Sequence, residues 1–322
     1  MGFSIHGSLA ANSRIVPSNQ TPLGALPARF RRERVLIVGC GDVGQRVAAP
    51  LVRRARVLAL TSTPERHSTL RGLGVVPLPG NLDDPASLRR LAGLATRVLH
   101  LAPPPSEGVQ DPRTHALLAA LSRRTVPRSL VYGSTSGVYG DCQGAWVRES
   151  RPVAPFTRRA FRRVDAEDAV RYWGLRWAGD ARALVLRIPG IYAPDREGGT
   201  PRERLLRGTP VLQREDDVFT NHIHADDLAR ACDLALWRTR AQRVVQVCDD
   251  TDLRMGDYYD LAADLYQLPR PQRLPRQTAE ATLPLMLLSF MSESRRLDNT
   301  RMRRELRLRL RYPTVREGLS VP

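Results

Sequence analysis

Arg34-Val-Leu-Ile-Val-Gly-Cys-Gly-Asp-Val-Gly44 is the stretch of sequence that decides the fold. Its first part, Arg34–Val38, is mostly apolar and β-branched, as in a strand buried inside a parallel sheet. The second part fits the pattern G-x-G-x-x-G and leads into a segment with Val43, Val47 and Leu51 at four-residue spacing, which indicates a helix. A glycine loop between a strand and a helix is typical of a dinucleotide-binding unit.

Each residue of this loop has an expected role. Gly39 permits the tight turn, Gly41 lets a pyrophosphate approach the backbone, and Gly44 lets the helix pack closely on the strand. Asp42 and Val43 open the helix, whose first amides hold negative charge. We therefore expect all five residues to line a dinucleotide; the alternative is a strand–helix turn without a ligand.

The alternation of strand and helix continues along the chain. Further strands are expected at 57–60, 75–78, 98–102, 129–132, 183–186 and 244–247. Helices are expected at 43–54, 64–73, 83–94, 114–124 and 161–173. Repeating units of this kind predict an α/β fold, namely a Rossmann-type doubly wound parallel sheet with a smaller, mostly helical C-terminal lobe. The expected division is a flexible arm at 1–30, a dinucleotide-binding domain at 31–190 to whose sheet the strand near 244–248 returns, and the smaller lobe at 191–322.

All 50 basic residues of the 322-residue chain are arginines, because the sequence contains no lysine. Schiff-base chemistry, a P-loop lysine and the lysine of a Tyr-x-x-x-Lys pair are therefore excluded. The net charge of +17 raises the alternative of a polyanion-binding protein, and Arg295–Arg316 holds nine arginines. That stretch has few aromatics and matches no nucleic-acid fold signature, so we expect a solvated basic surface and no specific nucleic-acid partner.

The four cysteines, Cys40, Cys142, Cys232 and Cys248, are far apart and form no C-x-x-C pair. This spacing gives no zinc site and fits a reducing compartment. Residues 1–30 lack the continuous apolar core of a signal peptide, and the chain has no apolar run of about 18 residues. The sequence therefore predicts a cytoplasmic protein that does not enter a membrane.

The end of the second expected strand bears on which dinucleotide binds. NAD sites usually place an acid there, about 20 residues after the glycine loop. Here the sequence reads Thr61-Ser62-Thr63, with no acid before Glu65 and with Arg66 close by. Hydroxyls and a guanidinium suit a 2′-phosphate, so Thr61, Ser62 and Arg66 predict NADP. NAD remains the alternative, with Arg66 as a solvated helix residue.

Val131-Tyr-Gly-Ser-Thr-Ser-Gly-Val-Tyr-Gly140 resembles the S-S-x-x-V-Y-G segment of the extended short-chain dehydrogenase/reductase family, in its NAD-dependent epimerase/dehydratase branch. Further matches follow in the family's order and together span about residues 34–320. They are the glycine loop, Gly80-Asn81-Leu82-Asp83, Leu186-Arg-Ile-Pro189-Gly190-Ile-Tyr192, the segment Asn221–Ala229, and the C-terminal stretch Arg303–Leu319.

The resemblance implies nicotinamide-dependent oxidoreductase or epimerase chemistry on a small-molecule substrate. It also implies a homodimer formed through the helices near 111–124 and 160–173. Thr135 matches the residue that holds the substrate oxygen in the family. The resemblance places these further residues beside the dinucleotide: Asn81, Leu82, Leu101, Ala102, Pro103, Pro189 and Gly190.

The tyrosine–lysine pair that transfers protons in the family is missing. At the matching positions the chain has Arg159 and Arg163, and arginine stays protonated at any working pH. Arg163 suits the cofactor ribose or a phosphate; the alternative is an ion pair with Glu167 on a solvated helix face. Tyr139 is a candidate substitute acid, and its alternative is a packed tyrosine.

Two functions therefore remain open: an enzyme of this family with an unusual active site, and a non-catalytic dinucleotide-binding sensor or scaffold. The pair His222 and His224 raises the question of a metal. We expect none, because the resemblance explains the segment and Asp226 or Asp227 suits a cap for a helix beginning at Leu228.

Overall fold

Strand β1 (Arg34–Val38) lies at the centre of the fold in this computed structural model, which describes residues 32–238 and 240–320. Its side chains alternate between two cores: Val35 and Ile37 pack into one, and Leu36 and Val38 pack into the other. All four are at most 1% exposed. A strand buried on both faces needs helices on both sides of its sheet.

The central sheet has seven strands in the order β12-β7-β5-β4-β1-β2-β3, and every neighbouring pair is parallel. The strands joining β1 are β2 (Arg56–Thr61), β3 (Val76–Pro79), β4 (Arg97–His100), β5 (Ser129–Thr135), β7 (Arg182–Ile188) and β12 (Arg243–Gln246). The strand order reverses between β1 and β4. Loops at the carboxyl ends of these two strands therefore diverge, which opens a place for a ligand.

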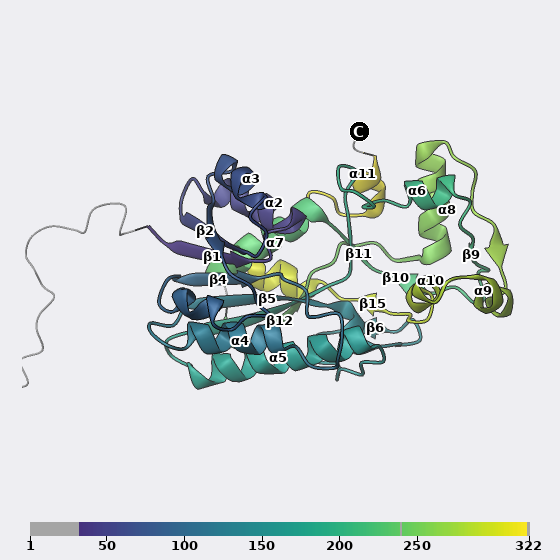
Figure 1. The fold of residues 1–322 in the computed structure, drawn as a ribbon. Coiled ribbons are helices and arrows are strands. Elements are labelled where there is room, and N and C mark those ends of the chain that lie inside the picture. Colours follow the sequence, from purple (N-terminus) through teal and green to yellow (C-terminus); the bar gives the residue numbers. More distant parts are fainter. Residues whose placement is uncertain (1–31, 239, 321–322) are drawn as a thin grey trace, which may run out of the picture. The chain divides into compact units, whose positions relative to one another are not determined.

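Helices cover both faces of the sheet (Figure 1). One face packs on α2 (Asp42–Leu51), α3 (Arg66–Gly72) and α7 (Ala225–Arg238), and the other on α4 (Pro112–Leu121) and α5 (Arg158–Arg176). This arrangement confirms the predicted doubly wound fold.

The helix expected at 83–94 is wrong, because the chain forms only a 3-10 turn at Ser87–Leu91. Asn81 and Asp84 accept hydrogen bonds from the amides of Asp83 and Ala86, each at 3.0 Å. Side chains that bond nearby amides in this way compete with a regular helix.

The rest of the chain alternates short strands with helices. The strand pairs are β8 (Gly190–Tyr192) with β11 (His222–His224), β9 (Val211–Leu212) with β14 (Arg273–Leu274), β10 (Phe219–Thr220) with β13 (Leu253–Arg254), and β6 (Trp146–Val147) with β15 (Arg296–Leu297). The helices are α6 (Arg202–Leu206), α8 (Met255–Tyr266), α9 (Arg276–Thr282), α10 (Leu285–Phe290) and α11 (Val315–Leu319), with a π-helical turn at Met302–Leu306. Tyr192, Tyr258 and Tyr259 form part of the core that α8 and α11 share.

The described residues from Glu33 to Ser320 form one compact unit. The predicted arm at 1–30 lies outside the described residues, and the division near residue 190 stays a prediction. In the described part of the chain, every helix is too short or too polar to cross a membrane.

Candidate dinucleotide and substrate site

The glycine loop has the geometry that a pyrophosphate needs. Gly39 has a φ of +89°, and a Cβ there would lie 2.3 Å from the Ala102 amide nitrogen. A Cβ on Gly44 would lie 2.9 Å from the Gly39 carbonyl oxygen. Around Gly41 the space is open, since a Cβ would meet no described atom within 4 Å. Helix α2 starts at Asp42 and no described side chain caps it, so its first amides face that open space and are suited to hold an anion.

Side chains at the start of α2 fix the loop to more distant segments. The Asp42 carboxylate lies 3.0 Å from Arg46 Nε and 3.3 Å from Arg196 Nε. Arg46 also pairs with Asp195 at 2.8 Å and with Asp226 at 2.6 Å. Val43 packs against the core beneath the loop. These contacts hold the loop in position before any ligand arrives.

Arg66 reaches over the glycine loop and donates a hydrogen bond to the Cys40 carbonyl. The end of β2 lies next to it in sequence, where Thr61 is 9% exposed and accepts a bond from the Thr63 amide at 3.2 Å. Ser62 is exposed. The structure thus anchors the guanidinium beside the loop.

The loops after β3 and β4 are tied to the same edge of the sheet. The amides of Leu101 and Ala102 donate to the Val38 carbonyl at 2.7 and 3.0 Å. Asp83 pairs with Arg113 at 2.6 Å, and this bond lowers the pKa of the Asp83 carboxyl. The remaining residues expected here are Asn81, which is exposed, Leu82, which is half-buried, and Pro103, which is exposed and whose carbonyl accepts from Arg113 at 3.3 Å.

A buried network joins β5 to β7 and α5. Ser134 Oγ donates to Glu167 Oε1 at 2.6 Å, and Arg187 Nη2 donates to Glu167 Oε2 at 2.7 Å. The Arg187 guanidinium also lies 4.6 Å from the centre of the Tyr139 ring, and the Tyr139 hydroxyl accepts from Gln246 at 3.0 Å. Tyr139 is 1% exposed, and burial raises its pKa. These contacts favour the packed alternative for Tyr139.

Thr135 lies at the carboxyl end of β5 and is half-buried. Its Oγ1 accepts a hydrogen bond from the Gly137 amide at 3.2 Å. No residue of the described chain accepts the hydroxyl hydrogen of Thr135. That hydrogen is therefore free to bond a substrate oxygen.

Arg163 does not form the ion pair with Glu167 that one interpretation of the sequence suggested. Its Nη1 donates to the Gly133 carbonyl at 2.8 Å and to the Tyr132 hydroxyl at 3.0 Å, while Glu167 bonds Arg187 instead. Arg163 is 8% exposed. The solvated-face alternative for Arg163 is thus wrong, since the side chain turns inward to the end of β5.

Pro189 follows β7, and Gly190 is the first residue of β8. A Cβ on Gly190 would lie 3.3 Å from the Asn221 carbonyl oxygen. Pro189 is half-buried. Both residues follow the carboxyl end of β7, two strands from β4 at the same edge of the sheet as the glycine loop.

The two histidines nearby are buried among aromatic rings. The His222 ring centre lies 4.2 Å from that of Tyr258, and His224 lies 3.8 Å from Tyr312. Burial lowers the pKa of His222 to about 3. His224 Nδ1 accepts a hydrogen bond from the Asp226 amide at 3.2 Å. This bond gives His224 a structural role at the start of the helix that follows it.

The expected cap at Asp226 or Asp227 is wrong. Helix α7 begins at Ala225, so both acids lie inside its first turn. Asp227 instead accepts from the amides of Arg311 and Tyr312 at 2.8 and 2.9 Å and holds the C-terminal segment against α7.

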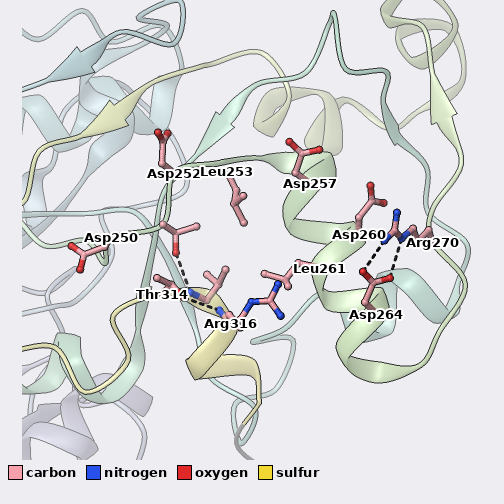
Figure 2. Close-up of a pocket in the computed structure, with 12 residues that line it drawn as sticks. Asp250, Asp252, Leu253, Asp257, Asp260, Leu261, Asp264, Arg270, Thr314 and Arg316 are labelled. Carbon is pink, nitrogen blue, oxygen red and sulfur yellow. Dashed lines mark hydrogen bonds and ion pairs between the residues drawn. The ribbon is translucent and has the colours of Figure 1, made fainter.

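A cavity of about 430 Å³ lies beside α8 and α11, and the sequence did not indicate it (Figure 2). None of the predicted cofactor or catalytic residues lines it. Its lining includes the carboxylates of Asp250, Asp252, Asp257, Asp260 and Asp264. Arginines already pair with these acids; Arg270, for example, bonds Asp264 at 2.8 Å.

Comparisons with known proteins agree with this geometry. The model of the NAD dependent epimerase/dehydratase family matches residues 35–248. Among solved structures, a conserved protein of unknown function from Silicibacter pomeroyi is 29% identical with a TM-score of 0.72, covering 89% of this chain and 96% of that chain.

Two further solved structures share the fold at the same coverage of 89% and 96%. MoeE5 in complex with UDP-glucose and NAD is 22% identical with a TM-score of 0.69. UDP-glucuronic acid 4-epimerase from Bacillus cereus, in complex with UDP-glucuronic acid and NAD, is 17% identical with a TM-score of 0.69. No curated protein matches the sequence.

Proposed function

Because this chain belongs to the NAD-dependent epimerase/dehydratase family, we propose that it binds NADP(H) and acts with it on a small-molecule substrate. The observation that supports this most is the open space at Gly41, which faces the uncapped start of α2 with Arg66 anchored beside it. Helix amides suit the pyrophosphate, and a guanidinium suits a 2′-phosphate.

The residues present fit the cofactor from one end to the other. The loop Gly39–Gly44 takes the pyrophosphate, Thr61, Ser62 and Arg66 take the adenosine end, and the loops with Asn81 and Ala102 flank it. Arg163, bonded to the Gly133 carbonyl, and the segment Pro189–Gly190 lie nearest the nicotinamide end. The nicotinamide ring, when bound, accepts or donates a hydride.

On the substrate side, Thr135 donates its free hydroxyl hydrogen to a substrate oxygen. Arg159 cannot carry the proton, because a guanidinium stays charged at working pH. Tyr139 is buried and already bonded to Gln246. We therefore assign Tyr139 to packing. We infer that solvent water gives a proton to the substrate oxygen when a carbonyl is reduced and takes that proton back in the reverse direction.

A larger side chain in the open space at Gly41 tests the cofactor site. In Gly41→Val the new side chain enters open space, so the fold should persist while the pyrophosphate is displaced. We expect NADPH to bind the wild type at micromolar Kd and more tightly than NADH. We expect Gly41→Val to weaken binding by at least about tenfold. Calorimetric titration in about 150 mM salt, which screens non-specific charge effects, measures both.

Gly72→Ala is the matched control, since Gly72 also faces open space but lies at the end of α3. It should bind NADPH like the wild type. Undiminished NADPH binding in Gly41→Val would exclude the glycine loop as the site. Preference for NADH would assign NAD in place of NADP.

We also propose that two copies of the chain associate through α4 and α5. Three apolar side chains stay exposed on α5: Phe161 at 44%, Tyr172 at 67% and Leu175 at 63%. Their spacings of 11 and 3 residues place them within about 60° of one another around the helix. An exposed apolar stripe on a regular helix suits burial against a second copy.

A further inference from the structure

Three arginines in the first two turns of α5 form a positive cluster. Arg159, Arg162 and Arg163 have the three- and four-residue spacings that bring side chains onto one face of a helix. Arg162 and Arg163 are only 7% and 8% exposed, whereas Arg159 is exposed. The cluster therefore presents one accessible guanidinium in front of two buried ones.

None of the three has a carboxylate partner in the part of the chain that the structure describes. Arg162 donates to the Gly108 carbonyl at 2.8 Å, Arg163 bonds Tyr132 and Gly133, and both leave a buried Nε without a hydrogen bond. Arg159 has no hydrogen bond or ion pair with any described residue. The buried Arg187 shows the contrast, since Glu167 neutralises it.

The acids on the same helix are already engaged elsewhere. Glu167 bonds Arg187 and Ser134, and Asp165 accepts from the Asp111 amide at 2.7 Å and from His115 at 3.0 Å. Buried charges without counter-charges are costly. Desolvation, and then repulsion from Arg163 and Arg162, lowers the pKa of Arg159. An anion bound here would relieve that repulsion.

The place of the cluster indicates which anion. Arg163 contacts the end of β5, two strands from β1 and its glycine loop, which is about 10 Å across the sheet. The pyrophosphate and the adenosine end already have the α2 amides and Arg66. The cluster therefore lies toward the opposite end of the cofactor, where the substrate reacts.

We propose that Arg159 binds a carboxylate of the substrate, with the positive potential of Arg162 and Arg163 supporting it. A guanidinium meets a carboxylate through two parallel hydrogen bonds, which fixes both position and orientation. The substrate class is then a hydroxy or oxo compound that carries a carboxylate near its reacting carbon. This inference rests on the proposed function for the identity of the anion as substrate.

The test titrates sodium oxalate, as a simple carboxylate probe, into protein saturated with NADPH and, separately, into protein without it. Ionic strength is held constant near 150 mM. We expect Arg159→Gln to weaken oxalate binding by about tenfold or more. Arg158→Gln is the matched control, because Arg158 is a neighbouring exposed arginine and the charge change is identical. It should bind oxalate within about twofold of the wild type.

Equal losses in the two variants would reduce the effect to net charge and overturn the proposal. Weakened NADPH binding in Arg159→Gln, with oxalate binding intact, would assign the cluster to the cofactor and also overturn it. Tighter binding of inorganic phosphate than of oxalate would overturn the choice of a carboxylate. If the wild type binds no NADPH but oxalate still depends on Arg159, the proposed function fails and the carboxylate site stands.

Discussion

Burial raises the pKa of Asp249. This residue belongs neither to the glycine loop nor to the arginine cluster. It is 4% exposed, and its Oδ1 accepts from the Thr251 amide at 3.0 Å. Desolvation raises the pKa of its carboxyl to about 7. In the unfolded chain an aspartate has a pKa near 3.9.

Between about pH 4 and pH 7, Asp249 is therefore protonated in the folded protein and ionised in the unfolded chain. Stability from this group is complete below about pH 4 and is lost as pH rises through 7. Asp249→Asn should remove this loss and be more stable than the wild type at pH 8. Urea unfolding at pH 5 and pH 8 measures it, with the exposed Asp168→Asn as control. Parallel pH profiles in wild type and Asp249→Asn would contradict the prediction.

Among single residues, the glycine loop was readable from the sequence because a left-handed turn and a close helix approach both demand glycine. The inward orientation of the Arg163 side chain could not be predicted from the sequence. Its partners, Tyr132 and the Gly133 carbonyl, lie 31 and 30 residues earlier in the chain. Only the packing of α5 against β5 brings them together.

At the level of elements, the pair Glu167–Arg187 joins α5 to β7. Both side chains are buried, and removing one partner leaves the other charge uncompensated. Glu167→Gln should lower the free energy of unfolding by about 3 kcal/mol or more. Guanidinium chloride unfolding followed by circular dichroism measures the change.

Asp264→Asn is the control for this experiment, because it removes an acid from the exposed pair with Arg270. Exposed pairs contribute little, so this variant should unfold almost like the wild type. Equal stability of Glu167→Gln and the wild type would mean that the buried pair does not hold α5 to the sheet.

Element boundaries followed the sequence where hydrophobic periodicity was strong, as in β1 and α2. They failed where side chains bond locally or at long range. The turn at Ser87–Leu91 replaced a helix because Asn81 and Asp84 bond nearby amides. Helix α7 starts before its expected cap, and Asp227 accepts hydrogen bonds from the amides of Arg311 and Tyr312, which lie 84 and 85 residues away in sequence.

For the whole molecule, the exposed stripe on α5 predicts a dimer. Sedimentation velocity should give twice the mass of the chain, and Tyr172→Asp should shift it toward the monomer while leaving the circular dichroism spectrum unchanged. Leu206→Asp is the control, since Leu206 is 58% exposed on α6, away from the stripe. A monomeric wild type at all concentrations would rule out the dimer.

The charge of the molecule also depends on the fold. Two arginines of the C-terminal stretch pair with acids that are far away in sequence. Arg303 pairs with Asp250, and Arg301 lies 3.6 Å from Glu149. Arg295 pairs with Glu293, which is close to it in sequence. Part of the positive charge is therefore neutralised locally, which the composition alone does not reveal.

The sequence by itself determined the parallel sheet, the glycine loop and the loss of the tyrosine–lysine pair, because each is written in short stretches of residue type and spacing. The tertiary structure alone decided which charges are paired. Glu167 meets Arg187, whereas Arg159, Arg162 and Arg163 meet no described carboxylate. Charge pairing depends on distances across the sheet between residues far apart in the chain, and those distances exist only once the helices have packed on it.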